Sequence, residues 1–125
     1  MDQKLRDAGR KVREEVLGKE YVDKALASAD DFNQDFQDLL NEYCWGFAWT
    51  REGLSRKTRS MLNIALLAAL GRSHELALHV RGAINNGVTR EEIREVLIHT
   101  AIYAGVPASV EGFRVAREAL KDTEA

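Results

Sequence analysis

Residues 55–87 have the sequence SRKTRSMLNIALLAALGRSHELALHVRGAINNG, and this pattern predicts two helices joined by a very short connection. Ser55 can cap the first helix, and Gly71 is suited to close it in a left-handed conformation. Ser73 can cap the second helix, which Gly87 would end. Because the connection is so short, the two helices must be antiparallel neighbours. The sequence therefore predicts an antiparallel helical hairpin at the centre of the chain.

The rest of the chain also favours helices. No segment alternates β-branched and polar residues as strands do, and a single proline leaves long helices unbroken. Gly46 and Gly53 interrupt EYCWGFAWTREGL, residues 42–54, which we expect to be irregular. The fold is predicted to be all-α, as one domain over residues 1–125. The helices expected outside the hairpin cover residues 2–17, 20–28 and 31–41, a segment from the capping box of Thr89 and Glu92 to Ala104, and a final segment that begins near Pro107.

Composition excludes several classes of protein. The chain has 125 residues, of which 45% are apolar and 30% charged, so it should fold rather than remain disordered. Its net charge of −2 gives no basic excess for binding nucleic acid. The longest apolar run, MLNIALLAAL, is half a membrane span and contains Asn63, and the charged N-terminal stretch has no signal-peptide core. We therefore expect a cytoplasmic protein with neither a membrane nor a nucleic-acid partner. A single cysteine, Cys44, excludes an internal disulfide and a Cys-x-x-Cys pair for redox chemistry or zinc.

Two helices carry more apolar surface than a monomer of this size needs. The helix that contains MLNIALLAAL is apolar on every side except at Asn63, which is typical of burial on all faces. The helix after Thr89 has a second apolar face, made by Ile98 and Ile102. This pattern predicts a homo-oligomer, with one face on the core and the other on a partner subunit. The face of the helix after Thr89 that is expected to pack on the core comprises Ile93, Val96, Leu97, Thr100 and Ala104. The alternative is that this helix is central in its own chain.

The second helix of the hairpin carries the first candidates for a functional site. Arg72, Glu75 and His79 share one stripe at helical spacing, beside apolar positions. Imidazole titrates near neutral pH, so His79 is a candidate proton or hydrogen-bond donor, and Glu75 could orient its ring. Arg72 could hold a carboxylate. The alternative is that this stripe is the solvated rim of a core, with Glu75 favoured by the helix dipole alone.

Further candidates lie on the first helix of the hairpin and in the aromatic segment before it. Arg59 and Asn63 lie one turn apart on the same face, and a guanidinium can bind a carboxylate through two parallel hydrogen bonds. Asn63, within an apolar run, needs a polar partner, either a neighbouring backbone or a ligand. Trp45 and Trp49 belong to an alternating aromatic cluster that either walls a pocket or forms core or interface.

Several motifs together resemble the carboxymuconolactone decarboxylase family, which also holds alkylhydroperoxidase-like redox proteins. The likeness covers nearly the whole chain, and it implies an all-α fold assembled into rings, commonly hexamers made of three dimers, with sites near subunit contacts. The residues that carry it are VREEVLGKEYVDKA (12–25), DFNQDFQDLL (31–40), EYCWGFAWTREGLSRKTRSMLNIALLAALGR (42–72), HELALHVRGAINNGVTREEIREVL (74–97) and AIYAGVPA (101–108).

The resemblance implies a decarboxylation in the breakdown of aromatic acids. A lactone with a carboxylate on its ring, γ-carboxymuconolactone, loses CO₂, and the electrons flow through the ring double bond to the lactone carbonyl. Protonation next to that carbonyl gives an enol-lactone. The substrate is its own electron sink, so neither metal nor cofactor is needed. The implied roles are catalysis by His79 and Glu75, and substrate binding by Arg59, Arg72, Trp45, Trp49 and Asn63.

The redox branch of the family carries a C-x-x-C motif followed by a histidine. If that histidine is set on His79, Arg72 and Glu75 stand where the two cysteines would be, so a dithiol cannot form. The sequence thus falls on the decarboxylase side. It departs from the usual decarboxylase pattern at Phe47, where an acid is common, and at Glu52, where proline is common, so which lactone it accepts is open. Two other functions remain: a hydroperoxidase that uses Cys44 alone, and a non-catalytic oligomeric binding protein.

Overall fold

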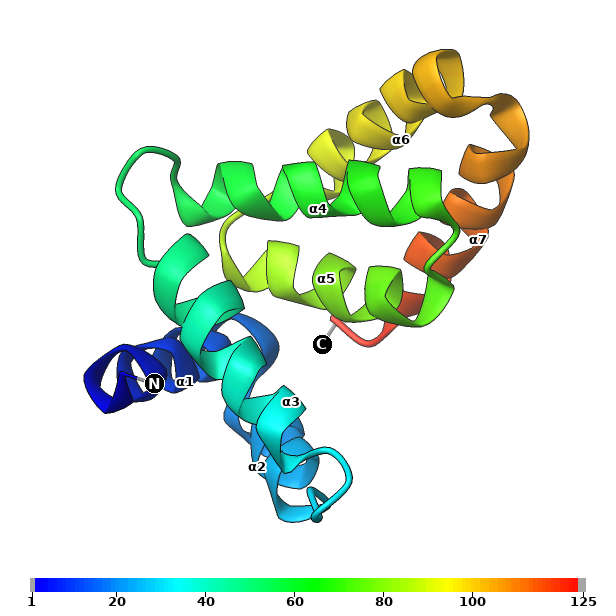
Figure 1. The fold of residues 1–125 in the computed structure, drawn as a ribbon. Coiled ribbons are helices and arrows are strands. Elements are labelled where there is room, and N and C mark those ends of the chain that lie inside the picture. Colours follow the sequence, from blue (N-terminus) through cyan, green and yellow to red (C-terminus); the bar gives the residue numbers. More distant parts are fainter. Residues whose placement is uncertain (1, 124–125) are drawn as a thin grey trace. The chain divides into compact units, whose positions relative to one another are not determined.

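The computed structural model describes residues 2–123, and in this range it contains helices and no strand (Figure 1). The prediction of an all-α fold is confirmed. The residues form two compact units, an N-terminal unit up to Leu54 and a C-terminal unit from Ser55. The prediction of one domain concerns how these units combine, and it stays a prediction. The helices are α1 (Gln3–Leu17), α2 (Lys19–Ala27), α3 (Gln34–Leu39), the π-helix η1 (Leu40–Ala48), α4 (Arg56–Leu70), α5 (Ser73–Asn85), α6 (Arg90–Ala104) and α7 (Val106–Lys121).

The N-terminal unit is built on the packing of α1 against η1. Its core comprises Val12 and Val16 of α1, with Trp45 and Trp49 from the other side. The two indole rings stack with their centroids 4.8 Å apart. Aromatic rings of this size bury a large apolar area, so this pair supplies much of the hydrophobic contact in a small unit.

The prediction that residues 42–54 are irregular is wrong for the first part of this segment. Helix α3 runs on into η1, which ends at Ala48. The amide of Trp49 donates to the carbonyl of Cys44 at 3.2 Å, five residues back, as in a π-helix. Gly46 does not break the helix, because it is buried where η1 meets α1. Burial of this face outweighs the low helix propensity of glycine.

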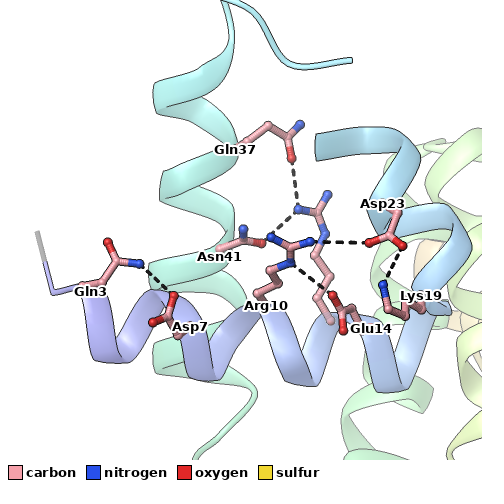
Figure 2. A network of polar contacts seen from close by, with 9 residues as sticks. Gln3, Asp7, Arg10, Glu14, Lys19, Asp23, Gln37 and Asn41 are labelled. Atoms are coloured by element: carbon pink, nitrogen blue, oxygen red, sulfur yellow. Dashed lines mark hydrogen bonds and ion pairs between the residues drawn. The ribbon is translucent and has the colours of Figure 1, made fainter. Parts of the chain in front are cut away.

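Polar side chains also join the helices of the N-terminal unit (Figure 2). The buried guanidinium of Arg13 donates from Nη1 to Gln37 Oε1 and to Asn41 Oδ1, each at 3.0 Å. At the surface, Arg10 contacts Asp23 of α2 at 3.4 Å. The buried bonds give the α1–η1 packing a defined register, since a displaced helix would leave Arg13 unpaired in the interior.

The predicted hairpin is confirmed in the C-terminal unit, where α4 and α5 pack side by side in opposite directions (Figure 1). Ser55 caps α4 by accepting a hydrogen bond from the amide of Thr58 at 3.1 Å. Gly71 closes α4 with φ at +71°, a left-handed conformation that favours glycine. The prediction that Ser73 caps α5 is wrong, because the N-cap position is Arg72 and its side chain makes no capping bond.

Helices α6 and α7 complete the C-terminal unit by packing on the hairpin and on each other. The predicted capping box is present at Thr89 and Glu92, and Pro107 lies in the first turn of α7. The side chains of Ile93 and Leu97 are fully buried in the shared core. Of the inward face predicted for α6, only Ala104, at the end of the helix, is exposed.

Apolar side chains remain exposed on α4 and α6. On α4, Ile64 is buried, but Leu66 and Leu70 are 57% and 66% exposed, so the burial of this helix on all faces, which was expected with the help of a partner subunit, stays a prediction. On α6, Ile98 and Ile102 are 46% and 75% exposed, so the alternative in which the chain itself covers both faces of this helix is wrong. One face of each helix is left uncovered.

Among the described residues, no helix is both long enough and apolar enough to cross a membrane. The cytoplasmic location stays a prediction.

Candidate functional site

A polar contact between the two helices of the hairpin lies at the centre of the candidate site. The side-chain amide nitrogen of Asn63 on α4 is 3.4 Å from Nδ1 of His79 on α5. An amide nitrogen only donates hydrogen bonds, so in this arrangement Nδ1 accepts and the ring proton lies on Nε2. Asn63 thus has a polar partner, as an asparagine in an apolar run requires.

The environment of His79 keeps its ring neutral. Burial lowers the pKa of His79 from 6.5 to about 4, while the negative charge of Glu75 acts in the opposite direction with a smaller effect. At neutral pH the side chain is therefore an uncharged imidazole with one N–H group. Such a ring can hold a hydrogen bond to a developing oxyanion without repelling cations nearby.

The other residues predicted for the hairpin lie on both sides of the Asn63–His79 contact. Arg59 is one turn before Asn63 on α4 and is half-buried. Glu75 is one turn before His79 on α5 and is exposed. Because the helices are antiparallel, these two lie in opposite directions along the hairpin, each about 6 Å from the central contact along its helix. Across the hairpin, the His79 ring contacts Asn63.

Arg72 is farther from the centre. It is exposed at the N-cap of α5, seven residues before His79, which is about 10 Å along the helix axis. The hairpin therefore brings together Asn63 and His79, with Arg59 and Glu75 one turn away, and leaves Arg72 at the edge of this group.

A second polar contact crosses the hairpin next to the first. The side-chain amide of Asn86 donates to Oγ of Ser60 at 2.9 Å, and Ser60 is fully buried. We did not predict this pair, although Ser60 belongs to the same face as Arg59 and Asn63. Asn86 lies just before Gly87, where an asparagine is ordinary at a helix end, so its sequence context gives no sign of an inward side chain. The contact fixes the register of α4 against α5, and hence the position of Asn63 opposite His79.

The two tryptophans predicted to bind substrate lie in the N-terminal unit. Trp45 and Trp49 are only 4% and 6% exposed, stacked on each other and packed on Val12 and Val16. Both tryptophans therefore belong to the core of the N-terminal unit, which is the alternative role predicted for this aromatic cluster. Their contact with substrate stays a prediction.

Cys44 has the properties of a packing residue. It is half-buried, and burial raises the pKa of its thiol, while the nearby charge of Arg13 lowers that pKa by less. A thiol with a raised pKa is protonated at neutral pH and is a weak nucleophile. Among the described residues, no cluster of three or more histidine, cysteine or acidic side chains is placed to hold a metal ion.

Two known decarboxylases resemble this chain over almost its full length, and a third resembles part of it. The 4-carboxymuconolactone decarboxylase of Acinetobacter baylyi is 46% identical over 121 residues, which cover 97% of this chain and 90% of that protein. The nitrosuccinic acid decarboxylase npaB of Metarhizium robertsii is also 46% identical, over 98% of this chain and 85% of its own length. A 4-carboxymuconolactone decarboxylase sequence of Pseudomonas putida is 45% identical over 47 residues, 37% of this chain and 98% of that sequence.

An all-helical fold, a neutral histidine held within a hairpin and two decarboxylases as near-full-length relatives define this protein as a carboxy-lyase. Residues 34–118 match the model of the carboxymuconolactone decarboxylase family. The chain belongs to this family.

Proposed function

We propose that the substrate is a carboxylated muconolactone, which the protein converts to the enol-lactone with loss of CO₂. The observation that carries this proposal is the Asn63–His79 contact, which presents a neutral imidazole N–H on a chain 46% identical to a 4-carboxymuconolactone decarboxylase. The bond between the ring carbon and its carboxylate breaks, and its electron pair moves through the ring double bond to the lactone carbonyl oxygen. The carbon beside that carbonyl then takes up one proton from water, and the hydroxide that forms is neutralised by the solvent.

In this mechanism His79 stabilises the charge that develops on the carbonyl oxygen. Its Nε2–H group donates to the oxyanion, an interaction that is stronger in the transition state than in the bound substrate. Arg59 holds a substrate carboxylate through its guanidinium, and Arg72 binds a second, more distant carboxylate. Glu75 acts on His79 through its charge, since it raises the pKa of the ring.

A second substrate is favoured by the relative from Metarhizium robertsii, which is named a nitrosuccinic acid decarboxylase and is just as similar to this chain. Nitrosuccinate also carries a carboxylate on a carbon whose electrons can move into a neighbouring sink, here the nitro group. The nitronate oxygen would then occupy the position of the lactone oxyanion at His79. Both substrates are dicarboxylates, so Arg59 serves the same purpose in each.

The test compares the two substrates on the purified protein. Loss of γ-carboxymuconolactone is followed by ultraviolet absorbance, and nitrosuccinate turnover by release of CO₂. We expect kcat/KM to be higher for the lactone by about tenfold or more, a preference of about 1.4 kcal/mol. A higher value for nitrosuccinate would reverse the order of the two candidates, and turnover of neither would refute the mechanism.

Replacing Asn63 tests how His79 is held. Asn63→Leu removes the donor to Nδ1 and keeps the number and branching of the side-chain heavy atoms, so the ring loses its fixed tautomer and orientation. We expect kcat to fall by about tenfold with little change in KM, in line with the loss of a group that orients a catalytic residue. Nitrogen-15 NMR of the imidazole should show the Nε2–H form in the parent protein and a mixture of tautomers in the variant. An unchanged tautomer together with an unchanged kcat would show that Asn63 does not position the ring.

Replacing Cys44 tests the hydroperoxidase alternative. Because burial raises the pKa of this thiol, Cys44→Ser should leave decarboxylase activity within about twofold. The protein should consume no peroxide with a dithiol reductant. A tenfold loss of activity without unfolding, measured beside circular dichroism, would assign the cysteine a catalytic part.

We also propose that the protein assembles into a ring, a hexamer made of three dimers. The exposed faces of α4 and α6 support this, since monomers seldom expose such contiguous apolar surface. Light scattering should give a mass several times the 14.0 kDa of one chain. Ile102→Glu places a charge on the exposed face of α6 and should release smaller species. Ala8→Glu adds the same charge at an exposed position of α1 and serves as the control. A stable 14 kDa parent would exclude the ring.

A further inference from the structure

A cavity of about 240 Å³ lies between α6 and α7 in the C-terminal unit. It is formed by the first half of α6 and the second half of α7, and none of Arg59, Asn63 or His79 lines it. It is therefore separate from the candidate site on the hairpin. The residues that line it are Arg90, Glu91, Ile93, Arg94, Leu97, Phe113, Ala116, Arg117 and Leu120.

The floor of this cavity is apolar. Ile93, Leu97, Ala116 and Leu120 are buried members of the core, and they present the inner face of both helices to the cavity. The half-exposed ring of Phe113 forms one wall. An inorganic anion would gain nothing from such a floor. A ligand with an apolar body gains about 25 cal/mol for each Å² of apolar surface that it buries there.

The rim of the cavity is basic. Arg90, Arg94 and Arg117 line it with one acid, Glu91, so three positive charges and one negative charge leave a formal charge of +2 on a chain whose net charge is −2. Arg94 lies 3.5 Å from the exposed carboxylate of Glu95, a weak surface pair. Among the described residues, no carboxylate forms an ion pair with Arg117. The first turn of α6 adds the positive end of its helix dipole.

We propose that this cavity binds a small organic carboxylate with a single apolar ring or a short chain. The apolar body lies on the floor of core residues, and the carboxylate meets Arg117 and Arg94 at the rim. The guanidinium groups match the two oxygens of a carboxylate. The volume is just below that of typical ligand pockets, which suits a single-ring acid rather than a larger metabolite. A site of this kind would let an aromatic acid bind without occupying the hairpin site.

Equilibrium dialysis of the whole protein with radiolabelled benzoate tests this site. We expect one benzoate per chain at the cavity, with a Kd on the order of 1 mM, as befits a ligand of so few atoms. Arg117→Gln should weaken this binding by about fivefold or more, as loss of a charge-assisted hydrogen bond implies. Arg114→Gln is the matched control, because Arg114 is on the same helix, pairs with Glu111 and does not line the cavity. It should leave the Kd unchanged.

Two further measurements separate this site from other anion sites. Arg59→Ala should not change benzoate binding at the cavity. If the Arg59→Ala variant no longer binds benzoate, the benzoate binds at the hairpin, and the proposal is overturned. Sulfate at the same ionic strength should compete poorly, because it cannot use the apolar floor. Three outcomes would each refute the site. The first is competition by sulfate equal to that by benzoate, and the second is an equal effect of Arg117→Gln and Arg114→Gln on binding. The third is no binding of benzoate up to about 20 mM, well above the expected Kd.

Discussion

His79→Ala is expected to lower kcat by about 100-fold or more while leaving the fold intact. Removing one donor to a developing oxyanion, or one positioned acid, costs roughly this factor in enzymes. The ring is only half-buried, so its removal should not unfold the C-terminal unit. The measurement is steady-state turnover of the better of the two substrates, with the melting temperature recorded for both proteins.

His74→Ala is the matched control, because His74 lies on the same helix and is exposed. It should retain the activity of the parent. The comparison also decides against the third function, a binding protein that kept the scaffold. Such a protein would lose nothing measurable when His79 is replaced. Unchanged turnover in His79→Ala would therefore show that the stripe of Arg72, Glu75 and His79 on α5 is only the solvated rim of a core. It would also show that His79 takes no part in the mechanism.

The pH dependence follows from the same residue. With a pKa of about 4, His79 is neutral from about pH 5 upward, so its contribution to kcat should stay constant between pH 5 and 8. Activity should fall as the pH approaches 4, because protonation of Nδ1 removes the acceptor for Asn63. A rate that instead falls with rising pH near 6.5 would show that His79 acts as a charged imidazolium, with the pKa of a solvated histidine.

The hairpin was predictable because its signals are local. A serine that can cap, a glycine that can take a left-handed conformation and a very short connection all lie within residues 55–73, and together they determine two antiparallel neighbours. The contact of Asn63 with His79 was not predictable in this way. Each residue was identified singly, but their pairing depends on the register of α4 against α5, which core packing and the Ser60–Asn86 bond fix.

The incorrect predictions arose where tertiary packing overrides local preference. Gly46 is a poor helix former, yet it lies in the helix η1 because a larger residue would not fit against α1. The apolar surface of α4 indicated burial on all faces; within the single chain Leu66 stays exposed, so that burial still depends on a partner subunit and stays a prediction. Apolar composition gives the amount of surface to be covered, and not whether the same chain covers it.

Gly9→Ala is expected to destabilise the N-terminal unit by about 3 kcal/mol or more, the upper range for an overpacked interior. A Cβ atom at Gly9 would overlap the carbonyl oxygen of Asn41 and lie 2.5 Å from the amide nitrogen of Gly46. These are backbone atoms of η1, so no rotation of a side chain relieves the overlap, and α1 must move away from η1. That movement also pulls Arg13 from its acceptor on Asn41.

Tryptophan fluorescence during urea unfolding measures this effect directly, because both tryptophans of the chain lie in the core of this unit. Gly53→Ala is the control: a Cβ atom there meets nothing within 4 Å, and the backbone does not have a positive φ. It should leave the midpoint unchanged or raise it slightly, since alanine reduces the freedom of the unfolded chain. Equal midpoints for the two variants would mean that α1 does not approach η1 so closely. A large difference would show that Gly9 and Gly46 allow the backbones of α1 and the π-helix η1 to come into contact. This close approach of the two helices is what lets a unit of about fifty residues bury Trp45 and Trp49.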